Sequence, residues 1–430
     1  MKSLTLTLIL LLALILSLSH QCYSFKLSNI NTRSSSSSLH KTIQSIDSKQ
    51  IISSVLGILL SFNVIDVKPA AALLAPLAQV GVKEFLVKDG KQWLRLSQPV
   101  GNDIKLGSLR SSSPEIEIQE NLELPRLRLE QVGFSNNPAW QKALSDVTAA
   151  KVAIESNRNT LIDNALDKDK AKASYDSVIE KVQDLMSVLK DKDAGKVFQL
   201  QDDAAQSFSD LRALQLPVKK LPYNIPEEFQ TLPLLAGRAK VEVIVDSKDG
   251  FSEESGKKHK TETFLLEVDG YHAPITAGNF IDLVQQKYYD DCKTDNVQQL
   301  IVQFGKTAKK PSSRTIPLEL FYRSDTEPTY STTSDDDMRA TEAFALPFQG
   351  YGALGMGRGV EDTDSASSEV FVLKWQQALM PPGRNTLDGF YSNFGYVISD
   401  NEQYWGQVTP NDVIRSIKVV EGIDNFIKKS

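Results

Sequence analysis

The chain has 430 residues, of which 41% are hydrophobic and 24% charged, and its formal net charge is −6. This length suits two domains plus a removable leader, and the acidic balance argues against nucleic acid as a partner. The whole chain has two cysteines and four histidines. These numbers predict neither a disulfide framework nor a metal site, and we expect no cofactor.

The N-terminal part predicts three targeting segments in succession. Residues 1–24 hold a short apolar core behind Lys2 and end in small residues, which is typical of a secretory signal peptide. Residues 25–50 are basic and rich in serine, as plastid transit segments are. Residues 51–72 are mainly apolar and end in alanines, which predicts a transfer signal into the thylakoid lumen. A retained membrane anchor is the alternative for this third segment.

This stacked leader resembles the leaders of algae whose plastids are wrapped by extra membranes. We therefore expect the mature protein in the thylakoid lumen of an alga with a secondary plastid, as a monomer that is peripheral to the membrane or free of it. Removal of the leader takes away more bases than acids. The mature chain is therefore more acidic than its precursor.

Residues 73–216 predict a helical bundle. From 137 to 216, apolar residues recur at three- and four-residue steps with short polar breaks, which is typical of antiparallel amphipathic helices. Another amphipathic segment, 80–96, is expected to add a helix. Residues 97–138 contain four prolines and little periodicity, so this part of the bundle is predicted to be an extended segment on the surface.

A second domain follows a stiff linker. The prolines in 217–239 exclude a helix there, and from 240 to 430 apolar residues alternate with a period of two, which predicts strands. A long helix is expected at 275–289 and a short one at 409–416. Many strands with two helices predict a closed barrel whose ends the helices cap. Two polar insertions, 246–262 and 323–342, are expected to be solvated loops.

Six motifs in this second domain occur in a characteristic order. They are APITAGNFIDLV, YYDD, LIVQFG, GALGMGR, SSEVFVL and LDGFYSNFGYV. Their order and spacing resemble a cyclophilin domain over 221–427. The linker PYNIPEEFQTLPLLAGRA resembles that of the large thylakoid-lumen cyclophilins, which carry an N-terminal PsbQ-like helical bundle. The resemblance implies a multidomain chain, with an all-α bundle followed by an eight-stranded closed barrel and two capping helices.

Cyclophilins catalyse rotation about X-Pro bonds, for which the barrier is roughly 18–20 kcal/mol. The reaction needs an apolar pocket for the proline ring, hydrogen bonds to the flanking backbone and a fixed cation. In the family that cation is an arginine, and the resemblance places Asn296 at its position. Arg358, at the edge of the groove, is the alternative source of a cation, although it could equally be a solvated surface charge.

The remaining groove positions follow from the same resemblance. They are Leu300, Ile301, Gln303, Gly357, Arg358, Phe371, Leu387 and Tyr391. Gln303, Phe371 and Leu387 match the family residues, and the others differ from them. The alternative for the matching residues is plain barrel packing. Loss of one preorganised donor typically costs about 2.7–4 kcal/mol, or a factor of about 100 to 1,000, so we predict little or no isomerase activity and no confident catalytic residue.

Three functions are compatible with these observations. The first is a lumenal binding and assembly factor, for which the family implies photosystem II subunits or assembly intermediates as partners, contacted through their lumen-exposed loops. The second is an active peptidyl-prolyl isomerase that uses another cation, against which Asn296 argues. The third is a PsbQ-like structural subunit of a photosystem.

Overall fold

The computed structural model describes residue 87 and residues 89–429, apart from 136, 254, 298–300, 307–313, 375–386 and 400–401. The three predicted targeting segments lie outside the described residues. Within the described part of the chain, no helix combines the length and the apolar character needed to cross a bilayer.

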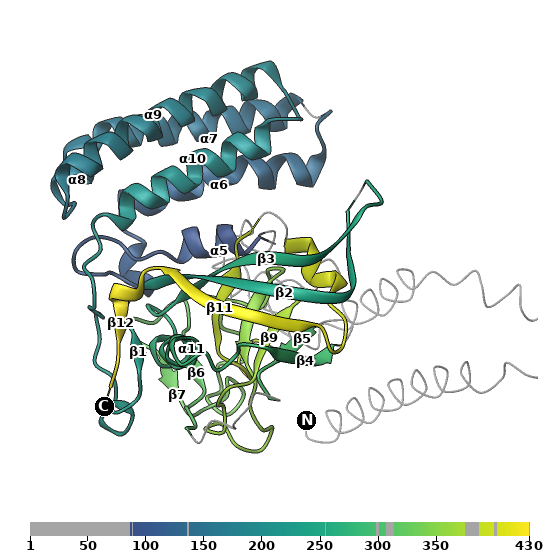
Figure 1. The fold of residues 1–430 in the computed structure, drawn as a ribbon. Coiled ribbons are helices and arrows are strands. Elements are labelled where there is room, and N and C mark those ends of the chain that lie inside the picture. Colours follow the sequence, from purple (N-terminus) through teal and green to yellow (C-terminus); the bar gives the residue numbers. More distant parts are fainter. Residues whose placement is uncertain are drawn as a thin grey trace, which may run out of the picture. The chain divides into compact units, whose positions relative to one another are not determined.

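The predicted helical bundle is confirmed in the described residues (Figure 1). The helices before the linker are α5 (Gly90–Ser97), α6 (Pro114–Val132), α7 (Asn137–Ser156), α8 (Arg158–Asp163), α9 (Lys168–Asp191) and α10 (Val197–Ala213). In α9 the buried residues Ala171, Tyr175, Val178, Val182, Leu185 and Leu189 form one stripe. Asp167 caps its N-terminus by accepting a hydrogen bond from the Lys170 N–H. The stripe packs against α7 and α10.

The prediction of an extended segment at 97–138 was wrong for 19 of its residues, because Pro114–Val132 forms helix α6. Pro114 lies in the first turn, where its missing N–H costs nothing. Pro125 lies inside the helix and breaks its hydrogen-bond ladder. The buried Gln201 of α10 compensates, since its side chain accepts from the Arg126 N–H at 2.8 Å and donates to the Glu123 carbonyl at 3.1 Å.

Helix α6 also lacks a single apolar stripe, because it is buried on two sides. Ile118, Leu122 and Leu129 belong to the apolar core of the bundle. Leu124 and Leu127 belong to a different cluster, which includes residues of the barrel. A helix with two buried sides shows weak amphipathic periodicity, which explains why the sequence pattern concealed it.

The second domain is a closed barrel in which the strands follow the order β10-β3-β2-β11-β4-β5-β9-β8, and β8 pairs with β10 to close it. The barrel strands are β2 (Arg238–Ser252), β3 (Lys258–Asp269), β4 (Cys292–Val297), β5 (Ile301–Phe304), β8 (Ala353–Met356), β9 (Val370–Leu373), β10 (Asn393–Val397) and β11 (Val413–Glu421). Short strands outside the barrel are β1 (Leu234–Leu235), β6 (Glu319–Leu320), β7 (Thr329–Tyr330) and β12 (Phe426–Ile427). The eight-stranded barrel expected from the resemblance is confirmed.

One of the two expected helices beside the barrel is present, as α11 (Pro274–Gln285). The other was wrong: residues 409–412 form a turn, and Val413 already begins β11. The insertion 246–262 is largely a paired continuation of β2 and β3 rather than a loop, and it projects from the barrel in Figure 1. Its Phe251 is fully buried against Phe264 and Tyr404.

A carboxylate from β6 caps the N-terminus of α11. Glu319 accepts hydrogen bonds from the backbone N–H of Ile275 at 3.3 Å, and from the N–H and hydroxyl of Thr276 at 3.0 and 2.9 Å. Glu319 is 2% exposed. Burial raises the pKa of Glu319 to about 7, which outweighs the opposite effect of these hydrogen bonds.

This raised pKa predicts a pH dependence of stability. Between pH 4.5, the ordinary pKa of the group, and about pH 7, the folded protein holds a proton on Glu319 that the unfolded chain has released. The contribution of Glu319 is therefore fully present below pH 4.5 and is lost as the pH rises through about 7. We expect the free energy of unfolding of Glu319→Gln, measured with urea, to depend less on pH over this range than that of wild type. The exposed control Glu228→Gln should keep the wild-type slope, and equal slopes in wild type and Glu319→Gln would refute the assignment.

Candidate functional site

One row of residues crosses four neighbouring strands of the barrel. Asn296 of β4 pairs with Gln303 of β5, Gln303 pairs with Phe371 of β9, and Phe371 pairs with Gly355 of β8. Directly paired residues of neighbouring strands share one face of a sheet. The register therefore places the three predicted groove residues Asn296, Gln303 and Phe371 in a single row, although they are far apart in the sequence.

Phe371 forms the apolar floor of this row. A Cβ atom at Gly355 would lie 2.0 Å from the Cζ atom of Phe371, so the ring rests directly on the backbone of β8. Phe348 stacks on the ring with centroids 5.6 Å apart, and Tyr391 meets it edge-on at 5.3 Å. Phe371 is 4% exposed, and its ring is held on several sides.

The amide of Gln303 is engaged by an acid that sequence reasoning missed. Gln303 Nε2 donates to a carboxylate oxygen of Glu369 at 2.7 Å. The Glu369 carbonyl in turn accepts the N–H of Gly357 at 2.7 Å. The sequence SEVFVL could have indicated this acid, because residues two apart in an extended segment, such as 369 and 371, point to the same side. The groove therefore contains a carboxylate beside its family glutamine.

Arg358 is held at the rim of the groove. Its Nε donates to the Phe390 carbonyl at 2.7 Å, and its Nη1 donates to the carbonyls of Gly359 and Val360 at 2.8 and 3.2 Å. Its guanidinium lies 5.6 Å from the Tyr391 ring centroid. These contacts tie Arg358 to the loop that follows β8, and none of them joins it to the row of Asn296 and Gln303.

The other groove residues are brought together in part. Ile301, Leu387 and Tyr391 are half-buried and pack against the apolar cluster that contains Phe371. Leu300 lies outside the described residues, and so do 375–386, which precede Leu387. The roles of these residues in binding stay predictions.

Helices α5 and α6 contribute to the same cluster as the groove. Trp93 and Leu94 of α5, together with Leu124 and Leu127 of α6, join Phe371 in it. The segment before α5 also pairs with the barrel, through a β-bridge between Asp89 and Tyr351. The apolar side of the groove is therefore packed against the helical part of the chain.

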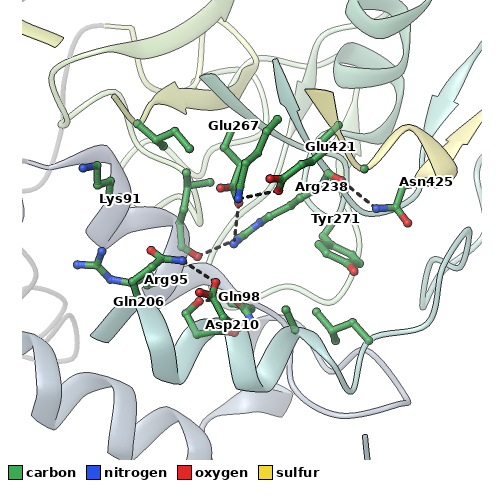
Figure 2. A pocket seen from close by; sticks show the side chains of 18 of the residues that line it. Lys91, Arg95, Gln98, Gln206, Asp210, Arg238, Glu267, Tyr271, Glu421 and Asn425 are labelled. Atoms are coloured by element: carbon green, nitrogen blue, oxygen red, sulfur yellow. Dashed lines mark hydrogen bonds and ion pairs between the residues drawn. The ribbon is translucent and has the colours of Figure 1, made fainter. Parts of the chain in front are cut away.

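A separate hollow of about 630 Å³ lies between α10 and strands β2 and β3 (Figure 2). Its charged groups bind one another: Arg238 pairs with Glu267 at 3.5 Å, and Lys240 pairs with Glu421 at 2.7 Å. On α10, Gln206 donates to Asp210 at 2.9 Å. Mutually paired charges of this kind are typical of a contact between domains, and the groove is the better candidate for a binding site.

Behind this hollow, Arg238 also binds the fully buried Asp269 at 2.8 Å. Burial opposes the charge on Asp269, but Arg238 and His272 outweigh burial and lower the pKa of this carboxyl. Asp269 therefore stays ionised inside the protein.

The closed eight-stranded barrel defines the class of protein, and comparison with known proteins agrees. The family described as "Cyclophilin type peptidyl-prolyl cis-trans isomerase/CLD" matches residues 257–409. The chain is 32% identical over 323 residues to "Putative thylakoid lumen peptidyl-prolyl cis-trans isomerase sll0408" of Synechocystis, which covers 72% of this chain and 81% of that protein. The chain belongs to the cyclophilin-type peptidyl-prolyl cis-trans isomerase family.

Two further similarities concern a plant protein and a solved structure. The chain is 28% identical over 390 residues to "Peptidyl-prolyl cis-trans isomerase CYP38, chloroplastic" of Arabidopsis thaliana, which covers 87% of this chain and 84% of that protein. A crystal structure of a Cryptosporidium parvum cyclophilin matches with 18% identity and a TM-score of 0.30, over 43% of this chain and 98% of that one. The names of the two sequence relatives, chloroplastic and thylakoid lumen, support the lumenal address predicted from the leader.

The close approach of Phe371 to Gly355 leads to a prediction about packing. In Gly355→Ser, the new side chain must displace the Phe371 ring, so we expect the free energy of unfolding to fall by about 1–3 kcal/mol. Gly195→Ser is the control, because this exposed glycine has only the Asp193 carboxylate nearby, 3.3 Å from its virtual Cβ. Urea unfolding measures both variants, and equal stability of the two would show that the ring is not held as described.

Proposed function

We propose that this protein is a thylakoid-lumen cyclophilin that binds proline-containing or lumen-exposed protein segments and has little or no isomerase activity. We propose further that it serves in the assembly, repair or stability of photosystem II. The observation that carries the first proposal is the row of Asn296, Gln303 and Phe371, in which the apolar floor is kept while a neutral residue stands at the position of the family cation.

The chemistry of X-Pro rotation explains why a neutral residue at this position lowers the expected catalytic rate. When the bond twists, amide resonance is lost and electron density returns to the proline nitrogen, where a fixed cation stabilises it. In this groove the charged side chain beside Gln303 is the carboxylate of Glu369. A negative charge repels the developing electron density, so the groove favours binding over catalysis.

The packing of α5 and α6 on the groove supports a binding role that involves the helical part. Trp93 and Leu127 are 3% and 6% exposed, in the cluster that contains Phe371. A ligand that fills the apolar side of the groove has to compete with these side chains. The helices therefore limit access to the groove, and they offer a second surface for a partner.

The lumenal location and the photosystem partner have different support. The leader and the names of the relatives agree on a plastid and lumenal address, and the stacked order of the leader segments supports an alga with a secondary plastid. Photosystem II subunits or assembly intermediates are proposed as partners from the family resemblance. Sub-stoichiometric association with assembly intermediates supports this proposal, whereas stoichiometric purification with the mature complex would favour a PsbQ-like structural subunit.

The missing cation predicts the outcome of an isomerase assay. The mature chain, residues 73–430, should accelerate isomerisation of a short X-Pro peptide by about 100- to 1,000-fold less than an enzyme that has the cation. Asn296→Arg should raise the rate, because the new guanidinium enters the row beside Gln303. The rate is measured by a protease-coupled assay at low temperature.

The control for this assay is Asn102→Arg, which adds the same charge at an exposed turn and should leave the rate unchanged. Strong turnover by the unmodified chain would overturn the proposal and favour an active isomerase. In that case Arg358 becomes the residue to test as the source of the cation.

The contacts of α5 and α6 with the groove predict that loosening them increases binding. Trp93→Ala and Leu127→Ala should each bind a proline peptide several-fold more tightly than wild type, measured by fluorescence anisotropy. Leu166→Ala, at a side chain 63% exposed on the bundle, is the control and should behave like wild type. Circular dichroism verifies that each variant is folded, and unchanged affinity in both variants would show that the helices do not restrict the groove.

A further inference from the structure

The carboxylate of Glu369 lies in the groove with little to balance its charge. Glu369 is half-buried, and among the described residues the side-chain partner of its carboxylate is the neutral amide of Gln303. Gly357, which directly follows β8, lies beside it, and a Cβ atom added there would be 3.1 Å from the Glu369 Cβ and 3.6 Å from the Gln303 amide nitrogen. A larger residue at this place would crowd the carboxylate and the amide.

The cation at the rim, Arg358, is bound elsewhere. The Arg358 guanidinium binds the carbonyls of Phe390, Gly359 and Val360. Asn296, at the family position for the cation, is neutral. Among the described residues around Gln303, Glu369 therefore supplies a negative charge, and this charge complements a cationic ligand.

The register also fixes how far this charge lies from the apolar floor. Glu369 directly precedes β9 and lies two residues before Phe371, which corresponds to roughly 7 Å of extended chain. An extended peptide advances by about 3.3–3.6 Å per residue. A side chain one or two residues from a proline bound over Phe371 therefore reaches the carboxylate.

We propose that Glu369 makes the groove selective for segments that carry a lysine or arginine within two residues of a proline. This inference rests on the proposed binding function and names the class of segment that the groove takes. Since Glu369 is partly accessible to water, the gain is moderate, and we expect about a three- to tenfold preference over a matched neutral peptide.

The test uses three peptides that differ at one residue beside the proline, which is lysine, glutamine or glutamate. Fluorescence anisotropy measures their dissociation constants for the mature chain, for Glu369→Gln and for Glu361→Gln. Glu361 is an exposed acid on the nearby rim segment, so its variant has the same change in net charge. Wild type and Glu361→Gln should prefer lysine over glutamine over glutamate. Glu369→Gln should bind all three peptides with similar affinity.

The outcomes separate this inference from the proposed function. Equal binding of the three peptides by wild type would overturn the selectivity but leave the binding function standing. Loss of the preference in Glu361→Gln as well would show that the effect comes from overall charge and not from Glu369. If none of the peptides binds to wild type or to the more accessible Trp93→Ala, the binding function itself fails, and the selectivity fails with it.

Discussion

The ion pair between Arg238 and Asp269 is the interaction on which the arrangement of the molecule depends. Asp269 is fully buried at the end of β3, where it also accepts the backbone N–H groups of Tyr271 and His272 and so shapes the turn before α11. Arg238 begins β2, and its Nη2 donates to the Leu94 carbonyl at 2.8 Å near the C-terminus of α5. One guanidinium thus joins the barrel, the entry to α11 and the helical part of the chain.

Helix α5 is bound equally firmly on its other side. Arg95 is ion-paired with Glu123 of α6, and both side chains are 2% exposed. Breaking such a buried pair by removing one partner typically costs about 3–5 kcal/mol, because the remaining charge is left without compensation. Two consecutive residues of α5 have different partners: Leu94 packs in the cluster that contains Phe371, and Arg95 binds Glu123 of α6. If the short helix turned about its axis, one of these two contacts would be lost. This double attachment keeps apolar side chains of α5 and α6 against the groove.

The proposed groove combines an aromatic floor with a neutral residue, Asn296, at the position where the family has a cation. The aromatic floor depends on packing, and Phe371, Phe348 and Tyr391 are held by one another. Stabilisation of the twisted amide depends in addition on a preorganised charge, which the proposed function takes to be missing. Burial of Phe371 contributes to the stability of the chain whether or not a substrate turns over, so the apolar part of the groove is retained for structural reasons as well.

Much of this architecture was predictable from the sequence alone. Helix α9 and strands β2 and β3 each follow one period and bury mainly one stripe or one face, so the sequence pattern alone indicates them. The order of the motifs was sufficient to predict the barrel, and the choice of Gln303 and Phe371 as groove residues stays a prediction. The replacement of the family cation by Asn296 was likewise a prediction from a single position.

Other features were decided only by contacts between distant parts of the chain. Helix α6 contains Pro125, and Gln201, 76 residues further along the chain, binds the backbone on both sides of this proline. No local pattern encodes that support. The segment 409–416 has a helical pattern, yet it continues into β11 because pairing with β2 and β4 outweighs local preference. The sequence by itself therefore determined the fold class, a helical bundle followed by a closed barrel. The tertiary structure decided that Glu369 meets Gln303 and that the helices pack on Phe371, because both depend on strand register and burial between segments far apart in the chain.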